Sequence, residues 1–215
     1  MDERAERDRV ITAGHQGRVQ TARSGLRHPA PMVRAAAVGA LARIGVLEPD
    51  ELLEALADPS AVVRRRAITE TVHVEEPDVD GPDKRRLLSA LLTQIDSAET
   101  AEAALWALGE QAGTDTLVVE RLMSVATAHA DPLCREAAVA ALGSIGDPRS
   151  LPAVLTATYD KATVRRRAVI ALAAFEGDEV DDRLQEALTD RDWQVSQAAE
   201  DLLLVPPGPE ERGEP

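Results

Sequence analysis

The amino-acid sequence predicts an all-α protein, a right-handed α-solenoid of about six two-helix repeats. Three observations lead to this fold class. Aromatic residues make up only 2% of the chain, so the core must consist mainly of Leu, Val, Ile and Ala. Ala and Leu are strong helix formers. One apolar pattern also recurs along the chain at intervals of 30 to 37 residues, and each copy has the spacing of one helix face.

The recurring pattern marks the second helix of each repeat. We number it from an anchor residue, usually arginine, that follows an apolar position. Apolar or small residues stand one before, three after and seven after the anchor, on one side of a helix that turns by about 100° per residue. The residue three after the anchor is always Ala, which lets neighbouring helices approach closely. The six anchors are Arg34, Arg64, Ala101, Arg135, Arg165 and Ser196.

A first helix is expected before each of these segments, because short Leu-rich stripes precede them. Proline beside an acidic residue marks the start of several first helices, since Pro fits the first helical position. Between the two helices, Pro breaks the first and Asp caps the second. His28 stands where other repeats carry the turn Asp, so we expect it to act as a cap. The stripes include Leu52, Leu53 and Leu56; Leu87, Leu88, Leu91 and Leu92; Leu117, Leu122 and Val125; Leu184 and Leu188.

Stacking the helix pairs in register would bury one continuous apolar core over residues 17–204. We expect residues 1–16 to form a capping segment. Residues 205–215 are rich in Pro, Gly and Glu, which predicts a disordered tail. An insertion at residues 74–83 carries five carboxylates without the ligand order of a calcium loop. A solvated acidic loop is therefore expected there, rather than a cation site.

Two segments identify a family resemblance. The stretches DPSAVVRRRA at 58–67 and SIGDPRSLPAVL at 144–155 resemble the HEAT-like repeats of the phycobilisome-lyase type. The likeness extends over about residues 17–204. It implies an internal ladder in which each anchor arginine reaches the turn aspartate of its own or a neighbouring repeat, although Ala101 and Ser196 depart from this pattern. The ladder would comprise Arg34, Arg64, Arg135 and Arg165 with Asp58, Asp131, Asp160 and Asp190.

Charge and composition narrow the possible partners. The formal net charge is -14, from 38 acidic and 24 basic residues, and a field of this sign repels nucleic acids and anionic lipids. We therefore expect neither as a partner. No segment is long and apolar enough to span a bilayer, which favours a cytoplasmic location. Cys134, the only cysteine, occupies an inward position of the pattern and is expected to be a buried, inert thiol.

Groups that could perform catalysis do not converge in the sequence. The four histidines are scattered singly, without a second ligand at metal spacing. Phosphate-binding loops and nucleophile motifs are missing from the sequence. The sequence therefore predicts a non-enzymatic protein without a cofactor or metal.

The helix face opposite the core carries the candidate binding residues. Positions one, two and five after each anchor point away from the core, towards the concave surface that second helices usually line in solenoids. An exposed Trp flanked by Arg pairs is typical of an interface hot spot. Alternatively, Trp106 folds onto the next repeat and the arginines form a solvated face. Trp193 is expected to pack over its hairpin. The candidates are Arg65, Arg66, Glu102, Trp106, Glu136, Arg166, Arg167 and Ile170.

These observations favour a monomeric scaffold or adaptor that binds a segment of another protein in a concave groove. Three alternatives stay open. The family resemblance implies, as one of them, a subunit of a bilin-chromophore lyase. A prokaryotic signalling or taxis adaptor is another. Some HEAT-like solenoids excise alkylated bases, but those depend on a basic, aromatic-lined face that this acidic chain hardly supplies.

Overall fold

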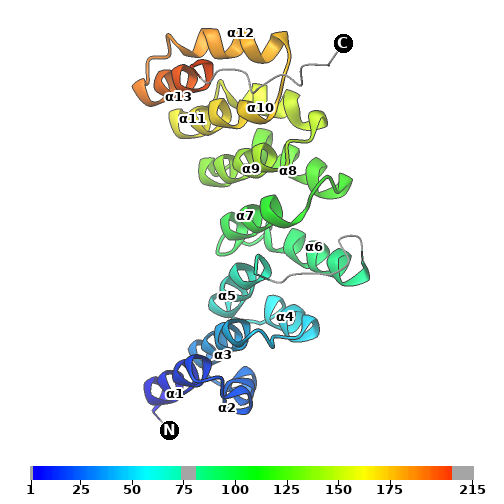
Figure 1. Ribbon diagram of the computed structural model, residues 1–215, viewed down its shortest axis with the longest axis vertical. Coiled ribbons are helices and arrows are strands. Elements are labelled where there is room, and N and C mark those ends of the chain that lie inside the picture. Colours follow the sequence, from blue (N-terminus) through cyan, green and yellow to red (C-terminus); the bar gives the residue numbers. More distant parts are fainter. Residues whose placement is uncertain (1, 74–80, 205–215) are drawn as a thin grey trace, which may run out of the picture. The chain divides into compact units, whose positions relative to one another are not determined.

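The computed structural model describes residues 2–73 and 81–204, and every regular element in these ranges is helical. The chain divides into two compact units, Met1–Gly113 and Thr114–Pro215. Each unit consists of helix pairs packed in two layers (Figure 1). Each unit contains three of the six predicted pairs, so the all-α solenoid class and the number of repeats are confirmed.

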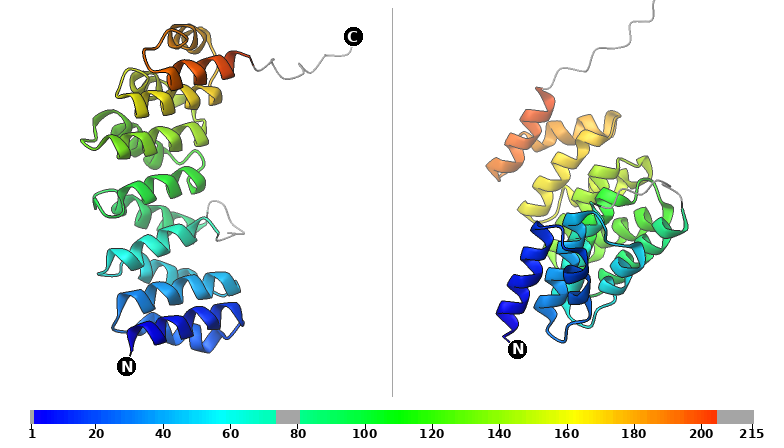
Figure 2. Two further views of the ribbon diagram at one scale, coloured as in Figure 1. Left: turned by 90° about the vertical axis from the view of Figure 1, so that its left-hand side faces the viewer. Right: turned by 60° about the horizontal axis from the view of Figure 1, so that its bottom comes forward.

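Unit 1 packs α1, α3, α5 and α7 side by side, while α4 and α6 form part of a second layer behind them (Figure 2). The helix α1 lies against α3. The elements of unit 1 are α1 (Glu3–His15), α2 (Val19–Ser24), η1 (Gly25–Arg27), α3 (Pro31–Ile44), α4 (Pro49–Leu56), α5 (Ala61–Thr71), α6 (Pro82–Gln94) and α7 (Ala101–Gln111).

Unit 2 repeats this arrangement. Its helices α9, α11 and α13 lie side by side, with α8 and α10 packed together in the other layer. We call the helices α1, α3, α5 and α7 of unit 1, and α9, α11 and α13 of unit 2, the second-helix layer of each unit. The elements of unit 2 are α8 (Thr116–Ala128), α9 (Pro132–Ile145), η2 (Pro148–Ser150), α10 (Leu151–Ala157), α11 (Ala162–Ala171), η3 (Leu172–Ala174), α12 (Asp178–Ala187) and α13 (Trp193–Leu203).

Local signals in the sequence begin and end these helices. The carboxylates of Asp115 and Asp131 accept hydrogen bonds from amides in the first turns of α8 and α9. Glu48 and Glu51 form a capping box at the start of α4. Gly45 and Gly146 end α3 and α9 in the left-handed conformation, with φ of 78° and 65°, which only glycine adopts without strain.

The predicted inward positions form the core. All six alanines three residues after the anchors are fully buried, and Cys134 is buried as expected. The positions seven after the anchors are also fully buried in the first five repeats, as Leu41 and Leu142 illustrate. The alanines are Ala37, Ala67, Ala104, Ala138, Ala168 and Ala199.

Three apolar residues lie outside the core contrary to expectation. Leu117 is 70% exposed because the buried stripe of α8 begins at Val118, one residue later and about 100° around the helix. Trp193 is 72% exposed, so the expectation that it packs over its hairpin is wrong. It stands two residues before the buried Val195, which places it on nearly the opposite face of α13. Leu188, just after α12, is also exposed.

The sequence predicts that residues 1–16 and 205–215 flank the repeats of residues 17–204. The expected capping segment 1–16 contains α1, which packs beside α3. The division of the chain near residue 113 is not apparent in the repeat pattern. The predicted tail 205–215 and residues 74–80 of the acidic insertion lie outside the described residues.

Two glycines within helices offer a matched test of the packing. A Cβ on Gly143 would lie 2.7 Å from the Cβ and 3.0 Å from the Cα of Ala171, so α9 and α11 would have to separate. A Cβ on Gly39 would meet only the movable guanidinium of Arg66. We expect the free energy of unfolding of the Gly143→Ala variant to be about 1–2 kcal/mol lower than that of the Gly39→Ala variant. Urea denaturation measures both values. Equal effects of the two substitutions would contradict this packing.

Candidate protein-interaction surface

Anchor arginines fasten consecutive helix pairs together and thereby position the second helices. Arg34 donates from Nε and Nη2 to the two carboxylate oxygens of Asp58 in the next turn, at 2.7 and 2.8 Å. Its Nη1 donates to the backbone carbonyls of His28 and Pro29 in its own turn, each at 2.9 Å. The guanidinium thus joins two turns by a bidentate ion pair and two backbone contacts.

The same contact recurs in unit 2. Arg135 donates to both carboxylate oxygens of Asp160 at 2.6 and 2.8 Å, and Arg165 donates to those of Asp190 at 2.7 and 2.9 Å. Both arginines also donate to carbonyls of their own turns. These side chains are largely shielded from water, which strengthens the pairing.

Two members of the expected ladder behave differently. Arg64 keeps its backbone contacts to the turn before α5, but its Nε donates to the amide oxygen of Gln94, and Glu99 lies 3.6 Å away. Asp131 pairs with no arginine among the described residues, and its carboxylate accepts the Leu133 amide at 2.9 Å instead. The anchor of the preceding repeat is Ala101, which has no side chain that could form this pair.

His28 occupies the turn position as expected. The Ala30 amide donates to His28 Nδ1 at 3.1 Å, just as the Ser60 amide donates to Asp58 at 2.8 Å. The imidazole nitrogen therefore replaces the aspartate as acceptor in this turn.

The arginine contacts lower the pKa of three aspartates of the ladder. The hydrogen bond from Arg34 holds the pKa of Asp58 below its usual value, although partial burial opposes this shift. Arg135 and Arg165 lower the pKa of Asp160 and of Asp190 in the same way.

We expect the buried rung in unit 2 to contribute measurably to stability. The substitution Arg165→Met leaves the Asp190 carboxylate without its partner in a nearly buried site and removes a hydrogen bond to the Asp160 carbonyl. The free energy of unfolding should fall by about 2–3 kcal/mol in urea titrations. The exposed neighbour Arg166 provides the control. Arg166→Ala should change the free energy of unfolding by less than about 0.5 kcal/mol.

The rungs should also make stability sensitive to acid. Because the pKa of Asp160 is lower in the folded protein, the unfolded chain takes up its proton first as the pH falls. The contribution is complete well above the ordinary Asp pKa of about 3.9 and disappears below it. Asp160→Asn should therefore cost stability at neutral pH, and this cost should shrink as the pH falls below about 4. A cost that stays constant over this range would contradict the assignment.

The outward face of the second-helix layer collects exposed apolar side chains. Seven of the eleven large apolar residues exposed among the described residues lie there, and each helix of the layer carries one. Scattered apolar residues are ordinary on a protein surface, but here most of them are concentrated on the second-helix layer. They are Ile11, Met32, Val62, Trp106, Leu133, Ile170 and Trp193.

The predicted binding residues lie on this layer in both units. Four belong to α5 and α7 of unit 1, and Trp106 is 45% exposed rather than folded into the core. The other four belong to α9 and α11 of unit 2, where Arg167 Nη2 lies 3.8 Å from Glu136 Oε1. The unit 1 residues are Arg65, Arg66, Glu102 and Trp106, and the unit 2 residues are Glu136, Arg166, Arg167 and Ile170.

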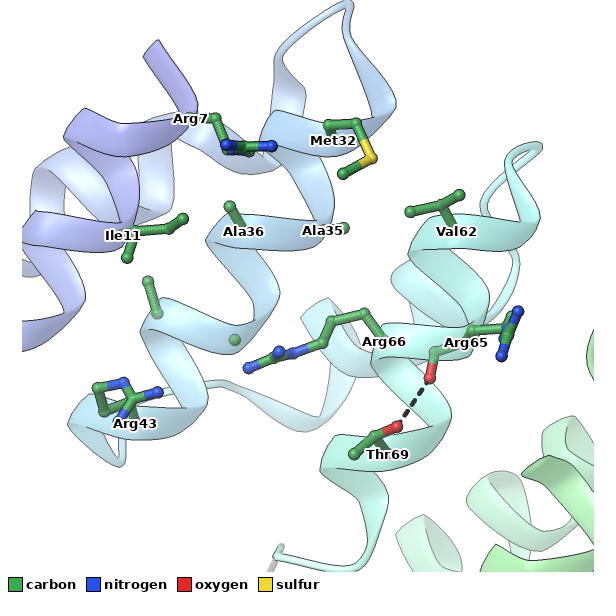
Figure 3. Close-up of a pocket in the computed structure, with 12 residues that line it drawn as sticks. Arg7, Ile11, Met32, Ala35, Ala36, Arg43, Val62, Arg65, Arg66 and Thr69 are labelled. Carbon is green, nitrogen blue, oxygen red and sulfur yellow. Dashed lines mark hydrogen bonds between the residues drawn. The ribbon is translucent and has the colours of Figure 1, made fainter. Parts of the chain in front are cut away.

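A pocket of about 570 Å³ opens on unit 1 between α1, α3 and α5 (Figure 3). We call it the arginine groove. Small residues of α3 line it, while exposed apolar side chains and four arginines surround them. Its principal lining residues are Arg7, Ile11, Met32, Arg43, Val62, Arg65 and Arg66.

Arg66 spans part of this groove. Figure 3 shows its side chain extending from α5 towards α3. A Cβ on Gly39 would lie only 1.9 Å from Arg66 Nη2, so the glycine makes room for the guanidinium. Arg66 Nε also lies 2.6 Å from the buried carboxylate of Glu70, one helical turn further along α5.

Two smaller pockets lie on unit 2. One of about 110 Å³ is lined by Glu136, Arg166 and Arg167. The other, of about 330 Å³, is lined by Ile170, Trp193 and neighbouring residues of α11 and α13. Both combine arginines with carboxylates, so neither has a single sign of charge.

Several residues of this surface were not predicted. Met32 and Val62 stand two before their anchors, and Arg43 stands nine after its anchor. Because a helix turns by about 100° per residue, these positions lie on the same side of the helix as the positions two and five after the anchor. The sequence could therefore have identified them. Arg7 and Ile11 belong to α1, which lacks the repeat pattern, so only the packing of α1 against α3 adds them.

Among residues 2–73 and 81–204, no three His, Cys, Asp or Glu side chains meet where they could hold a metal ion. Within the same ranges, every helix is too short or too polar to cross a bilayer.

A family model for HEAT repeats matches residues 85–163 and 119–203, which together form more than half of the chain. The chain belongs to the HEAT-repeat family. The resemblance noted in the sequence is thereby confirmed. No curated protein matches the chain by sequence.

Solved structures similar to this HEAT-repeat protein share its fold at low sequence identity. One is an engineered protein, 20% identical, with a TM-score of 0.62 over 86% of this chain and 96% of that chain. Another is the complex of CpcE and CpcF of phycocyanin lyase from Nostoc sp. PCC7120, 20% identical, with a TM-score of 0.56 over 72% and 97%. A third is a designed armadillo repeat protein in complex with the peptide (KR)4, 16% identical, with a TM-score of 0.57 over 94% and 98%.

Proposed function

We propose that this HEAT-repeat protein is a non-enzymatic scaffold or adaptor that binds a segment of another protein on the outward face of its second-helix layer. The observation that carries the proposal is the distribution of exposed apolar residues, one on every helix of that layer. Burial of such residues drives most protein association.

The chemistry of this face supports a protein partner. Trp106 and Trp193 are exposed, and Arg65, Arg66 and Arg166 lie on the same layers. Trp and Arg dominate binding hot spots, because each combines a large contact area with directional polar groups. Rigid helices also hold these side chains in place before a partner arrives, which lowers the entropic cost of binding.

The similar structures are compatible with this function. The designed armadillo repeat protein holds a peptide, and CpcE is found in a complex with CpcF. At these identities the similarity extends to the fold alone, so it supports the kind of surface and not the partner. A role as a bilin-lyase subunit and a role as a taxis adaptor stay predictions from the sequence.

Trp106→Ala tests the surface directly. We expect tagged protein from the native host to lose a captured partner, because a hot-spot Trp contributes about 2 kcal/mol or more to binding. Leu117→Ala is the matched control, since Leu117 is even more exposed but lies on α8, outside the second-helix layer. Partner capture is measured by quantitative mass spectrometry and repeated with the purified partner.

Circular dichroism should show the same helical signal for both variants. Equal capture by wild type and Trp106→Ala would remove Trp106 from the interface. Loss of capture in Leu117→Ala alone would move the interface to the other layer and overturn the proposal.

A further inference from the structure

We propose that the arginine groove of unit 1 binds an acidic segment of a partner protein, and that this segment inserts an apolar side chain between α1, α3 and α5. This inference rests on the proposed function and adds the chemistry of the partner. It concerns a surface whose residues all belong to unit 1.

The charge of the groove is the reverse of that of the whole chain. The chain carries 38 acidic and 24 basic residues. The groove is lined by Arg7, Arg43, Arg65 and Arg66 and by no Asp or Glu. A concave surface of one sign concentrates ligands of the opposite sign. Carboxylates are matched to it because guanidinium groups bind them through two parallel hydrogen bonds.

The groove arginines are less occupied than those of the ladder. Arg43 and Arg65 form no ion pair within the described residues. Arg7 reaches only its neighbour Asp8, at 3.4 Å, and its Nε has no hydrogen-bond partner there. Arg66 is the exception, since it lies beside Glu70. The guanidinium groups of Arg43 and Arg65 are therefore available to carboxylates of a partner, and Arg7 is held only by its contact with Asp8.

Apolar residues stand between these charges. Ile11, Met32 and Val62 are 42%, 41% and 46% exposed. They surround Ala35 and Ala36 of α3, so this part of the groove is apolar, while the Arg66 guanidinium covers Gly39 beside it. A volume of about 570 Å³ admits a large side chain together with adjoining backbone. The matching ligand is thus apolar at its centre and acidic at its flanks.

These features favour a polypeptide over a nucleic acid. Single-stranded nucleic acids bind basic grooves in which aromatic side chains stack on the bases. None of the residues that line the arginine groove is aromatic, and its apolar side chains are those of Ala, Val, Ile and Met. The acidic remainder of the chain would also repel a long polyanion that extends beyond the groove.

Fluorescence anisotropy with defined probes tests the inference on the full chain. The probes are a labelled Glu-rich peptide with a central Leu, the same peptide with Gln in place of Leu, a Lys-rich peptide with the central Leu, and a single-stranded oligonucleotide of similar length. We expect only the first to bind well, with an affinity that falls as salt is raised. Replacing its Leu should weaken binding by about tenfold.

Two groove variants separate charge from shape. The double substitution Arg43→Glu and Arg65→Glu should weaken binding of the Glu-rich peptide by about tenfold or more. Gly39→Leu should have a similar effect, since its side chain fills the groove and displaces the Arg66 guanidinium, while Leu favours the helix more than Gly does. The control is Arg18→Glu with Arg27→Glu, exposed residues outside the groove, which changes the net charge equally. Thermal unfolding of each variant confirms that the fold is retained.

The outcomes are distinct. Equal loss of binding in the control pair would indicate attraction by overall charge and overturn the inference, as would tighter binding of the Lys-rich peptide or of the oligonucleotide. A partner captured through Trp106 but unaffected by the groove variants would refute the groove while leaving the proposed function intact. Peptide binding at the groove combined with equal capture by wild type and Trp106→Ala would support the groove and remove Trp106 from the proposed interface.

Discussion

The contact between an anchor arginine and the turn aspartate of the next repeat is the constraint on which the rest of the structure depends. Arg34, Arg135 and Arg165 each hold two consecutive turns in one hydrogen-bonded arrangement. The alanines three residues later let the helices approach without a gap. Together these features fix the rotation of α3, α9 and α11, because the arginine and the alanine are both held at defined positions around each helix. The exposed side chains of consecutive second helices within a unit therefore lie next to one another on the outward face of the layer.

Much of this arrangement was predictable because short-range periodicity decides it. A position three after an anchor is buried in every repeat, whatever the rest of the sequence contains. The ladder was predictable only where the turn keeps its aspartate. Gln94 takes the place of this acid for Arg64, and Ala101 leaves Asp131 without an arginine, so the pattern weakens at the third repeat.

Other features could not be predicted from the repeat. The exposure of Trp193 follows from its position on the helix relative to the buried Val195, which the expectation of packing over the hairpin left out of account. The groove depends on α1, which carries no copy of the pattern yet supplies Arg7 and Ile11. Whether a residue is available to a ligand also depends on its partners in space. Arg64, Arg65 and Arg66 are three adjacent residues of the same type, but their contacts differ. Arg64 donates to Gln94, Arg66 lies beside Glu70, and Arg65 forms no ion pair within the described residues.

The missing side chain at Gly39 has a mechanical consequence. Because no Cβ lies beneath it, the Arg66 guanidinium rests on backbone at the end of a long, rotatable stem. Rotation of a few side-chain bonds, with loss of the contact to Glu70, would lift it away. The depth of this part of the molecule can therefore adjust without any helix shifting. A rigid array of helices acquires in this way one adaptable element, which lets the same backbone accommodate sequences of different bulk.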